Sequence, residues 1–299
     1  MSDTLNSGSG SGSGILGFVS GKGFFQQLLL VLVLLTLLFF LFVTVEYLTV
    51  SFMRLGSKAV QLMPYTVSAE DKQYVLRQDL TKFPDGKLIP LSDNERTGVE
   101  FSYSFYLYVN PSTFTGDDTL KHVFHKGFVT PWPLMGPGVF VKGDSNTLRV
   151  VMNTHQNPMT YVDVENIPVR KWFHCVLVCK KNSLEVYLNG NLIKKLPFEG
   201  TLPYQNFQDL IMFSPLKYTL SKTQVASLAN VGLRGDTLRF EGAFSGSLSN
   251  LTYFAYAISY TEIQALTTAG VSTRTLTKSQ DMPPYLTDTY WTSTYQQQN

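Results

Sequence analysis

The sequence predicts an all-β sandwich carried on one N-terminal transmembrane helix, with a short helix near its C-terminal end. Three observations lead to this prediction. Residues 28–45 run without a charge, and short apolar runs recur after residue 100. Aromatic residues make up 13% of the chain, which favours strands because flat side chains pack well on a pleated, half-buried surface.

The apolar run is long enough to cross a bilayer as a helix, because about 20 apolar residues span a hydrocarbon core of roughly 30 Å. A signal peptide is the alternative interpretation. Against it, the run exceeds the usual apolar region of roughly 7 to 15 residues, and Glu46-Tyr47 follows where small residues should stand. Lys22 on one side faces Arg54 and Lys58 on the other, and this small excess favours a cytoplasmic C-terminal domain.

Composition divides the chain into five segments. About 230 residues follow the apolar run, which suits one large β domain. The Ser-Gly repeats before the run form a flexible leader, and Pro64 ends a helical stalk because its ring disfavours helix in the preceding residue. The predicted segments are a leader at 1–23, the transmembrane helix at 24–50, a stalk at 51–65, the sandwich at 66–270 and an extended polar and aromatic tail at 271–299.

Strand patterns fill the predicted sandwich. Residues 101–109 alternate apolar and polar side chains, and Asn110-Pro111 ends that strand. Asn189-Gly190 between two apolar runs predicts a hairpin with a type I′ turn. Ser259 and Glu262 have capping-box spacing ahead of a short helix that Gly270 can close. Further strands are expected near 122–125, 138–142, 148–152, 161–164, 172–180, 184–188, 192–196, 210–213 and 248–257.

The two cysteines, Cys175 and Cys179, lie in one strand-like run. Four residues of strand span roughly 13 Å, whereas a disulfide needs Cα atoms within about 7 Å. We therefore expect two reduced, buried thiols, which fits a domain on the cytoplasmic side of a membrane.

Four segments in this order resemble the laminin-G-like, concanavalin-A-like jelly rolls: 101–111, Trp172-Phe-His-Cys-Val-Leu-Val, Leu184-Glu-Val-Tyr-Leu-Asn-Gly-Asn-Leu and 246–266. The resemblance covers roughly residues 66 to 270. It implies a concanavalin-A-like two-sheet jelly roll and no particular chemistry, since such folds serve lectins, glycosidases, adhesion modules and virion structural proteins.

The acidic pairs and the histidine pair are the candidates for catalysis or metal binding. A glycosidase needs two carboxylates on one face, and Asp163 and Glu165 share a strand face, but Tyr161 stands where such enzymes carry a further acid. His122 and His125 are expected to face opposite sides of a strand and to be structural. No catalytic residue and no cofactor are therefore expected. Loop residues Asp117 and Asp118 are weak candidates for calcium.

Aromatic residues are the candidates for binding. Tyr106 and Tyr108 on the face away from the core, and Trp132 in a loop, could stack on a sugar or a protein, unless residues 214–240 cover them. In the tail, Tyr285, Tyr290 and Trp291 could dock onto a neighbouring subunit, the alternative being plain disorder. Asn250-Leu-Thr252 is a glycosylation sequon that matters only outside the cytoplasm.

These features fit three functions. The first is a non-enzymatic structural protein that links a lipid bilayer to a capsid or scaffold; the combination resembles membrane-associated minor capsid proteins of large DNA viruses and implies a virion location between membrane and capsid. The second is a membrane-anchored, lectin-like attachment protein that binds glycans. The third is a glycoside hydrolase. With 24 basic against 22 acidic residues, nucleic acid is not expected as a partner.

Overall fold

The computed structural model describes residues 23–84, 86–96, 98–221 and 237–274, and it divides between Arg54 and Leu55 into two compact units. Helix α2, Phe24–Ser57, has 34 residues and is about 51 Å long at the usual helical rise. Every residue from Val31 to Val50 is exposed. The Thr44 hydroxyl donates a hydrogen bond to the Phe40 carbonyl one turn earlier, so this polar group is satisfied within the helix.

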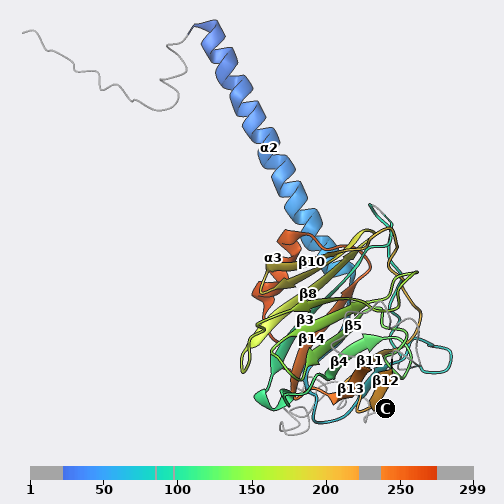
Figure 1. The fold of residues 1–299 in the computed structure, drawn as a ribbon. Helices are drawn as coiled ribbons and strands as arrows, with labels where there is room; N and C mark the ends of the chain where they lie inside the picture. The colour runs from blue at the N-terminus through green and yellow to red at the C-terminus, as the bar shows by residue number, and fades with distance from the viewer. Residues whose placement is uncertain (1–22, 85, 97, 222–236, 275–299) are drawn as a thin grey trace, which may run out of the picture. The chain divides into compact units, whose positions relative to one another are not determined.

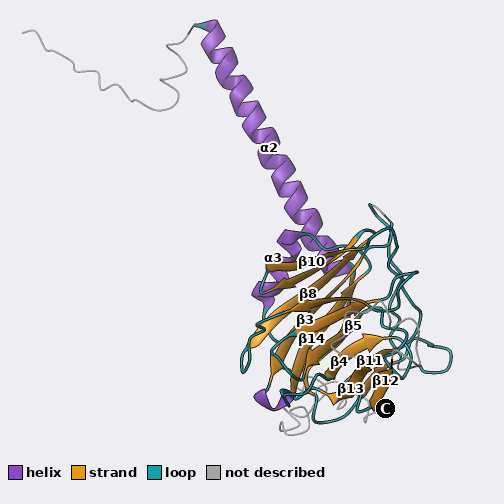
Figure 2. Ribbon diagram, viewed as in Figure 1, coloured by secondary structure: helices purple, strands orange, loops and turns teal. Residues whose placement is uncertain are grey.

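The second unit is a β-sandwich, and Figure 2 shows its strands as two layers with helix α3, Tyr260–Ala269. The first sheet has the order β1-β14-β3-β8-β9-β10, all antiparallel. Its strands are β1 Ala59–Ser68, β14 Gly246–Phe254, β3 Phe101–Val109, β8 Trp172–Lys180, β9 Ser183–Leu188 and β10 Asn191–Pro197.

The second sheet has the order β12-β13-β4-β5-β6-β7; β11 pairs with β4, and β2 pairs with β11. Figure 1 labels β4, β5, β11, β12 and β13 of this sheet. Its pairs are antiparallel except β13 with β4, which run parallel. Its strands are β12 Lys217–Ser221, β13 Thr237–Ala243, β4 Leu120–Lys126, β5 Gly138–Lys142, β6 Leu148–Met152, β7 Thr160–Val164, β11 Leu210–Met212 and β2 Tyr74–Leu76. A 3-10 turn, η1, occupies Pro111–Thr113.

The core fills the space between the two sheets. Phe105 from the first sheet meets Phe124 from the second edge-to-face, with ring centroids 5.1 Å apart and neither side chain exposed. Cys175 and Cys179 lie in the same core, unpaired and buried, as expected from their spacing along one strand. The sequence-based prediction of a two-sheet β-sandwich with an apolar N-terminal helix and a short C-terminal helix is therefore confirmed.

Two local predictions also hold. Asn189 and Gly190 both have positive φ, 47° and 82°, in the two-residue connection between β9 and β10. Ser259 caps α3 in a capping box with Glu262, whose carboxylate accepts from the Ser259 amide at 2.6 Å.

The beginning of the sandwich differs from the prediction. Residues 59–65 were expected in a stalk, but they belong to β1, which pairs with β14 from Ala59 to Ser68. The prediction continued the helix to Pro64, whereas α2 ends at Ser57 and the chain enters β1 directly. Pro64 is tolerated within β1 because β1 is the edge strand of its sheet and its register with β14 is interrupted between Met63 and Thr66. Strands β2, β12 and β13 were also missed.

The sandwich has two ends, which we call the near end and the far end. At the near end the chain enters β1 at Ala59, opposite Phe254, and β3 begins there. The loops at 77–98, 127–137 and 198–209 leave strands at this end. The hairpin turn at Asn189-Gly190 and the loops at 143–147 and 165–171 lie at the far end.

Gly246, where β14 joins β3, allows no side chain. A Cβ at this position would lie 2.0 Å from the Tyr108 carbonyl oxygen. Gly246→Ala is expected to lower the free energy of unfolding by about 2–4 kcal/mol, because the strands must separate locally. Urea unfolding of the detergent-solubilised protein, followed by near-UV circular dichroism, measures this loss. Gly200→Ala is the matched control: nothing lies within 4 Å of its Cβ, so only the positive φ of 66° opposes it, at about 1–2 kcal/mol. Equal losses for both variants would contradict the close contact.

Candidate functional site

A polar pocket of about 390 Å³ lies on the outer face of the second sheet. Strands β5, β6 and β7 send alternate residues into the core, and the intervening residues form this outer face. At the far end, loop residues complete the rim. The lining of the pocket includes Asp118, Lys142, Arg149, Tyr161, Asp163 and Glu165.

Arg149 is the central group of the pocket. It stands directly opposite Asp163 in the β6–β7 register. Its Nε and one terminal nitrogen each donate to one carboxylate oxygen of Asp163, both at 2.7 Å. The Arg149 side chain is only 8% exposed, and its guanidinium carbon lies 4.1 Å from the centroid of the Tyr161 ring. This two-point pair on an aromatic face fixes the positions of all three side chains.

The pocket carries balanced charge. Its lining contains three basic side chains, including Lys142 and Arg149, and three acidic ones, Asp118, Asp163 and Glu165. Lys142 is itself held by Asp144 at 3.1 Å. A ligand here meets fixed hydrogen-bond donors and acceptors and no net charge, which suits a neutral hydroxylated molecule.

The other half of this outer face is covered. Tyr218 of β12 stacks on Phe240 of β13 with ring centroids 4.7 Å apart, and its hydroxyl accepts from the Trp132 amide at 3.1 Å. Trp132 packs against the same small apolar cluster. It is therefore partly buried in this cover, and it is not among the residues that line the pocket.

The two tyrosines expected on the outer face of the first sheet differ in accessibility. Tyr106 is buried: its ring stacks on His174 at 4.6 Å, and its hydroxyl donates to the carbonyls of Leu266 and Thr267 in α3. The cover of Tyr106 that the structure describes is α3, while the described parts of the 214–240 segment form β12 and the start of β13 in the second sheet. Tyr108 lies near Trp172 at the far end, with ring centroids 5.5 Å apart; Tyr108 is half-buried and Trp172 is exposed.

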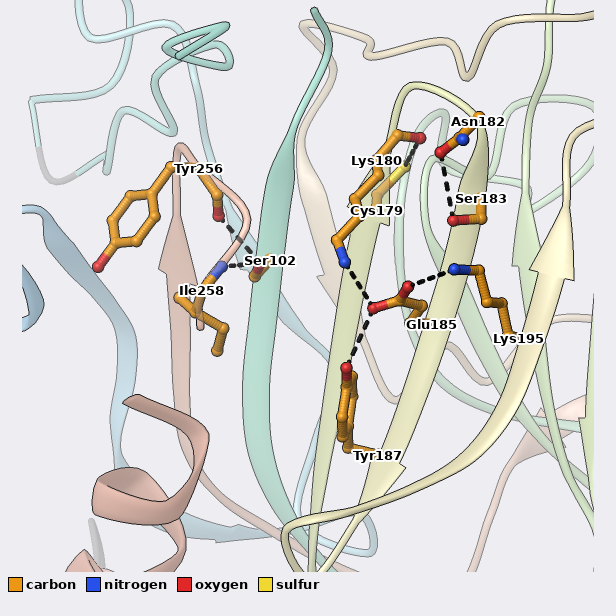
Figure 3. Close-up of polar contacts among 10 residues, drawn as sticks. All are labelled: Ser102, Cys179, Lys180, Asn182, Ser183, Glu185, Tyr187, Lys195, Tyr256 and Ile258. Atoms are coloured by element: carbon orange, nitrogen blue, oxygen red, sulfur yellow. Dashed lines mark hydrogen bonds and ion pairs between the residues drawn. The ribbon is translucent and has the colours of Figure 1, made fainter. Parts of the chain in front are cut away.

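Two carboxylates that could serve an acid–base pair, Asp163 and Glu185, are already engaged, and Glu165 is exposed in the pocket lining. Asp163 is bound by Arg149. Figure 3 shows the other buried candidate, Glu185, whose carboxylate accepts from Lys180 at 2.8 Å and Tyr187 at 3.0 Å and pairs with Lys195 at 3.0 Å. Burial alone would raise the pKa of Glu185, but these hydrogen bonds outweigh it and the pKa is lowered. A general acid needs the opposite shift.

The two histidines of β4 do not face opposite sides as expected. An irregularity in the β4–β5 register between His122 and Phe124 turns the strand, so that the two imidazoles meet with 2.6 Å between Nε2 of His122 and Nδ1 of His125. The Ser214 amide donates to Nδ1 of His122, and Nε2 of His125 lies 2.7 Å from the Phe128 carbonyl. Two neutral rings satisfy all of these contacts, each with its proton on Nε2.

His174 is a third buried histidine, and both of its ring nitrogens also have hydrogen-bond partners. Its Nε2 lies 2.8 Å from the Ser104 hydroxyl, and its Nδ1 lies 2.8 Å from the Thr267 hydroxyl. Thr267 donates to the Ile263 carbonyl, so it accepts from Nδ1. A serine beside an imidazole is also the arrangement of a nucleophile and its base. Here Ser104 and His174 are 3% and 1% exposed beneath α3, so the pair anchors the helix.

The remaining candidates are scattered. Asp118 lines the pocket. The described residues contain no group of three or more His, Cys, Asp or Glu side chains that could hold a metal ion, so no further ligands support calcium binding at Asp117 and Asp118. Asn250 is half-buried at an irregularity of the β14–β3 register, with φ of 53°. Its glycosylation stays a prediction. Tyr285, Tyr290 and Trp291 lie outside the described residues.

The pocket itself was missed from the sequence. Its signal is Arg149, a lone charge inside the apolar run Leu148-Arg-Val-Val-Met152. The partner, Asp163, was identified, but as half of a carboxylate pair. Only the β6–β7 register brings the two side chains together.

No protein-family profile and no curated protein match the chain. Several solved structures are similar in fold. The binding domain of botulinum neurotoxin serotype D has a TM-score of 0.46 and 10% identity over 72% of this chain and 45% of its own. The binding domain of Paraclostridial Mosquitocidal Protein 1 has a TM-score of 0.44 and 11% identity over 71% of this chain and 46% of its own. The binding domain of botulinum neurotoxin DC, solved with SialylT, has a TM-score of 0.40 and 12% identity over 57% of this chain and 35% of its own. The chain thus spans less than half the length of each.

The buried histidines predict acid sensitivity. Burial lowers the pKa of His125 and of His174 to about 4, and that of His122 well below its usual value. The unfolded chain binds protons at these positions below about pH 6.5, whereas the folded chain does not. Stability is therefore expected to fall from about pH 6.5 to about pH 4, by about 3 kcal/mol for a histidine shifted this far.

Urea midpoints measured across this pH range test the expectation. His125→Gln should flatten the dependence, whereas His155→Gln, which changes an exposed histidine, should leave it unchanged. A pH dependence that is undiminished both in His125→Gln and in a matching His174→Gln variant would exclude these two histidines as its source.

Proposed function

We propose that this chain is a single-pass membrane protein whose sandwich is a non-enzymatic binding module. The anchor is supported by α2, which exposes an uncharged, largely apolar surface from Val31 to Val45. Such a surface is unfavourable in water, and the helix is long enough to cross a bilayer. We place the anchor at residues 24–50, with the tail at 271–299 available for further contacts.

The binding site that we propose is the pocket around Arg149. The observation that carries this proposal is the Arg149–Asp163 pair beneath the Tyr161 ring, which is a rigid polar site on an open sheet face. Because the charges in the lining balance, the ligand class is a neutral glycan. The hydroxyl groups of a sugar can use the Asp163 and Glu165 oxygens as acceptors, and its apolar face can stack on an aromatic ring.

A non-enzymatic role is supported by the state of the carboxylates. Glycoside hydrolysis needs one carboxyl group to donate a proton while another attacks or activates water. Asp163 is bound at both oxygens by Arg149, and Glu185 is held ionised by two lysines. Neither is available to donate a proton.

The pocket predicts a specific loss of binding. Tyr161→Ala removes the aromatic wall and is expected to reduce glycan binding up to about tenfold, since an aromatic contact of this kind contributes about 0.5–1.5 kcal/mol. A glycan array probed with the full chain in nanodiscs identifies the ligand, and titration of that glycan measures the change. Tyr260→Ala, at an exposed position in α3, is the matched control and should bind normally. Wild-type protein that binds no glycan would remove the proposal.

A second function is supported by the free edge of the first sheet. Strand β10 is the last strand of its sheet among the described residues, and Leu192 and Ile193 are 49% and 45% exposed on it. Such an edge can pair with a strand of another protein. This arrangement fits the structural role expected from the sequence, in which the chain links a membrane to a capsid or scaffold within a virion.

Crosslinking separates the two functions. If the chain is structural, lysine-reactive crosslinking of native particles or membranes is expected to join exposed Lys194 of β10 to one abundant shell protein. Lys217, exposed on the second sheet, is the internal comparison. Crosslinks spread evenly over both lysines and over many partners would count against the structural role.

A further inference from the structure

Exposed apolar side chains are concentrated at the near end of the sandwich. Within the part of the sandwich that the structure describes, fourteen large hydrophobic residues are exposed, and ten of them lie in the near-end loops or at the start of α3. The most exposed are Phe207 at 71%, Val129 at 65% and Tyr260 at 59%. The four elsewhere are Trp172, Leu192, Ile193 and Leu216.

The chain enters the sandwich at this same end. Lys58, just before β1, pairs with Asp93 at 2.9 Å and with Glu95 at 2.7 Å, which ties the first residues of the unit to the 77–98 loop. Only three residues lie between Arg54 and Lys58, and the four Cα–Cα steps that join the two residues reach at most about 14 Å. The chain therefore joins the apolar helix to the sandwich at the end where these loops leave their strands.

The near-end loops are braced against one another. The buried Lys126 ammonium donates to the carbonyls of Asn206 at 2.5 Å and Gln208 at 3.0 Å. The side chain of Gln205 accepts from the Ser92 amide at 2.9 Å, which joins the 198–209 loop to the 77–98 loop. Loops held in this way present their apolar tips at little cost in conformational entropy.

Several charged groups at this end are paired within the protein. Lys58 is paired with two carboxylates, and Arg77 donates to Asp209 at 3.0 Å. The apolar side chains, and not an excess of one charge, therefore distinguish this surface. Isolated exposed hydrophobic residues are ordinary, but a cluster on one end of a domain marks an interaction surface.

We propose that the near end lies against a lipid bilayer and inserts the tips of its loops, with Phe207 and Val129 foremost, into the interface. This inference rests on the proposed function in one respect, that α2 spans a membrane. The bilayer that holds the helix is then the nearest apolar phase available to these side chains. Contact at both the helix and the loops restricts how the sandwich tilts above the membrane.

An environment-sensitive dye tests the proposal in the full chain reconstituted into phosphatidylcholine vesicles. The dye is attached at Phe207→Cys, at Val129→Cys, or at the matched control Leu216→Cys, which is exposed immediately before β12 and outside the near-end loops. The native thiols of Cys175 and Cys179 are buried, and burial raises their pKa, so they do not compete for the label.

A dye at position 207 or 129 is expected to shift its emission to the blue and to lose most of it to a nitroxide carried on the lipid. A dye at position 216 should show neither change. Water-like emission at both near-end positions, from protein that resists alkaline carbonate, would overturn this inference and leave the anchor intact. Release by carbonate would instead overturn the anchor. Shielding that occurs only in native membranes, and not in pure lipid, would assign the surface to a protein partner and contradict the proposal.

Discussion

The pairing of β1 with β14 decides how the rest of the sandwich is arranged. Because β1 starts at Ala59, directly after the apolar helix, the chain must enter at the end where β14 finishes. The loops of that end are apolar at their tips. The Arg149 pocket draws its rim from loops at the opposite end, so one strand pairing separates a surface suited to lipid from a site suited to a polar ligand.

Much of this fold could be predicted from the sequence, because its signals are local. The positive φ values at Asn189-Gly190 and the capping box at Ser259 depend on neighbouring residues, and both were found where expected. Strand β1 was missed because the helix was expected to continue to Pro64, and a strand that contains proline is permitted only by its place at a sheet edge. That place is set by the distant strand β14, which no local pattern identifies.

The candidate site was less predictable, since it depends on register. Arg149 and Asp163 are fourteen residues apart, and their contact exists only because β6 and β7 place them opposite each other. A shift of one residue would send Arg149 into the core. The histidines of β4 show the same limit: regular alternation separates His122 from His125, and one irregularity in the register brings them together.

The distribution of paired charges explains how both surfaces can coexist on one small domain. A buried charge is stable only with a partner, and here Arg149, Lys142 and Glu185 all have one. With the charges neutralised in place, and with 24 basic and 22 acidic residues overall, the domain exerts little long-range attraction on a membrane or a ligand. Recognition must then come from short-range contact, which favours apolar insertion at one end and fixed hydrogen bonds at the other. A covalent anchor suits such a protein, because it supplies the proximity that electrostatic steering would otherwise provide.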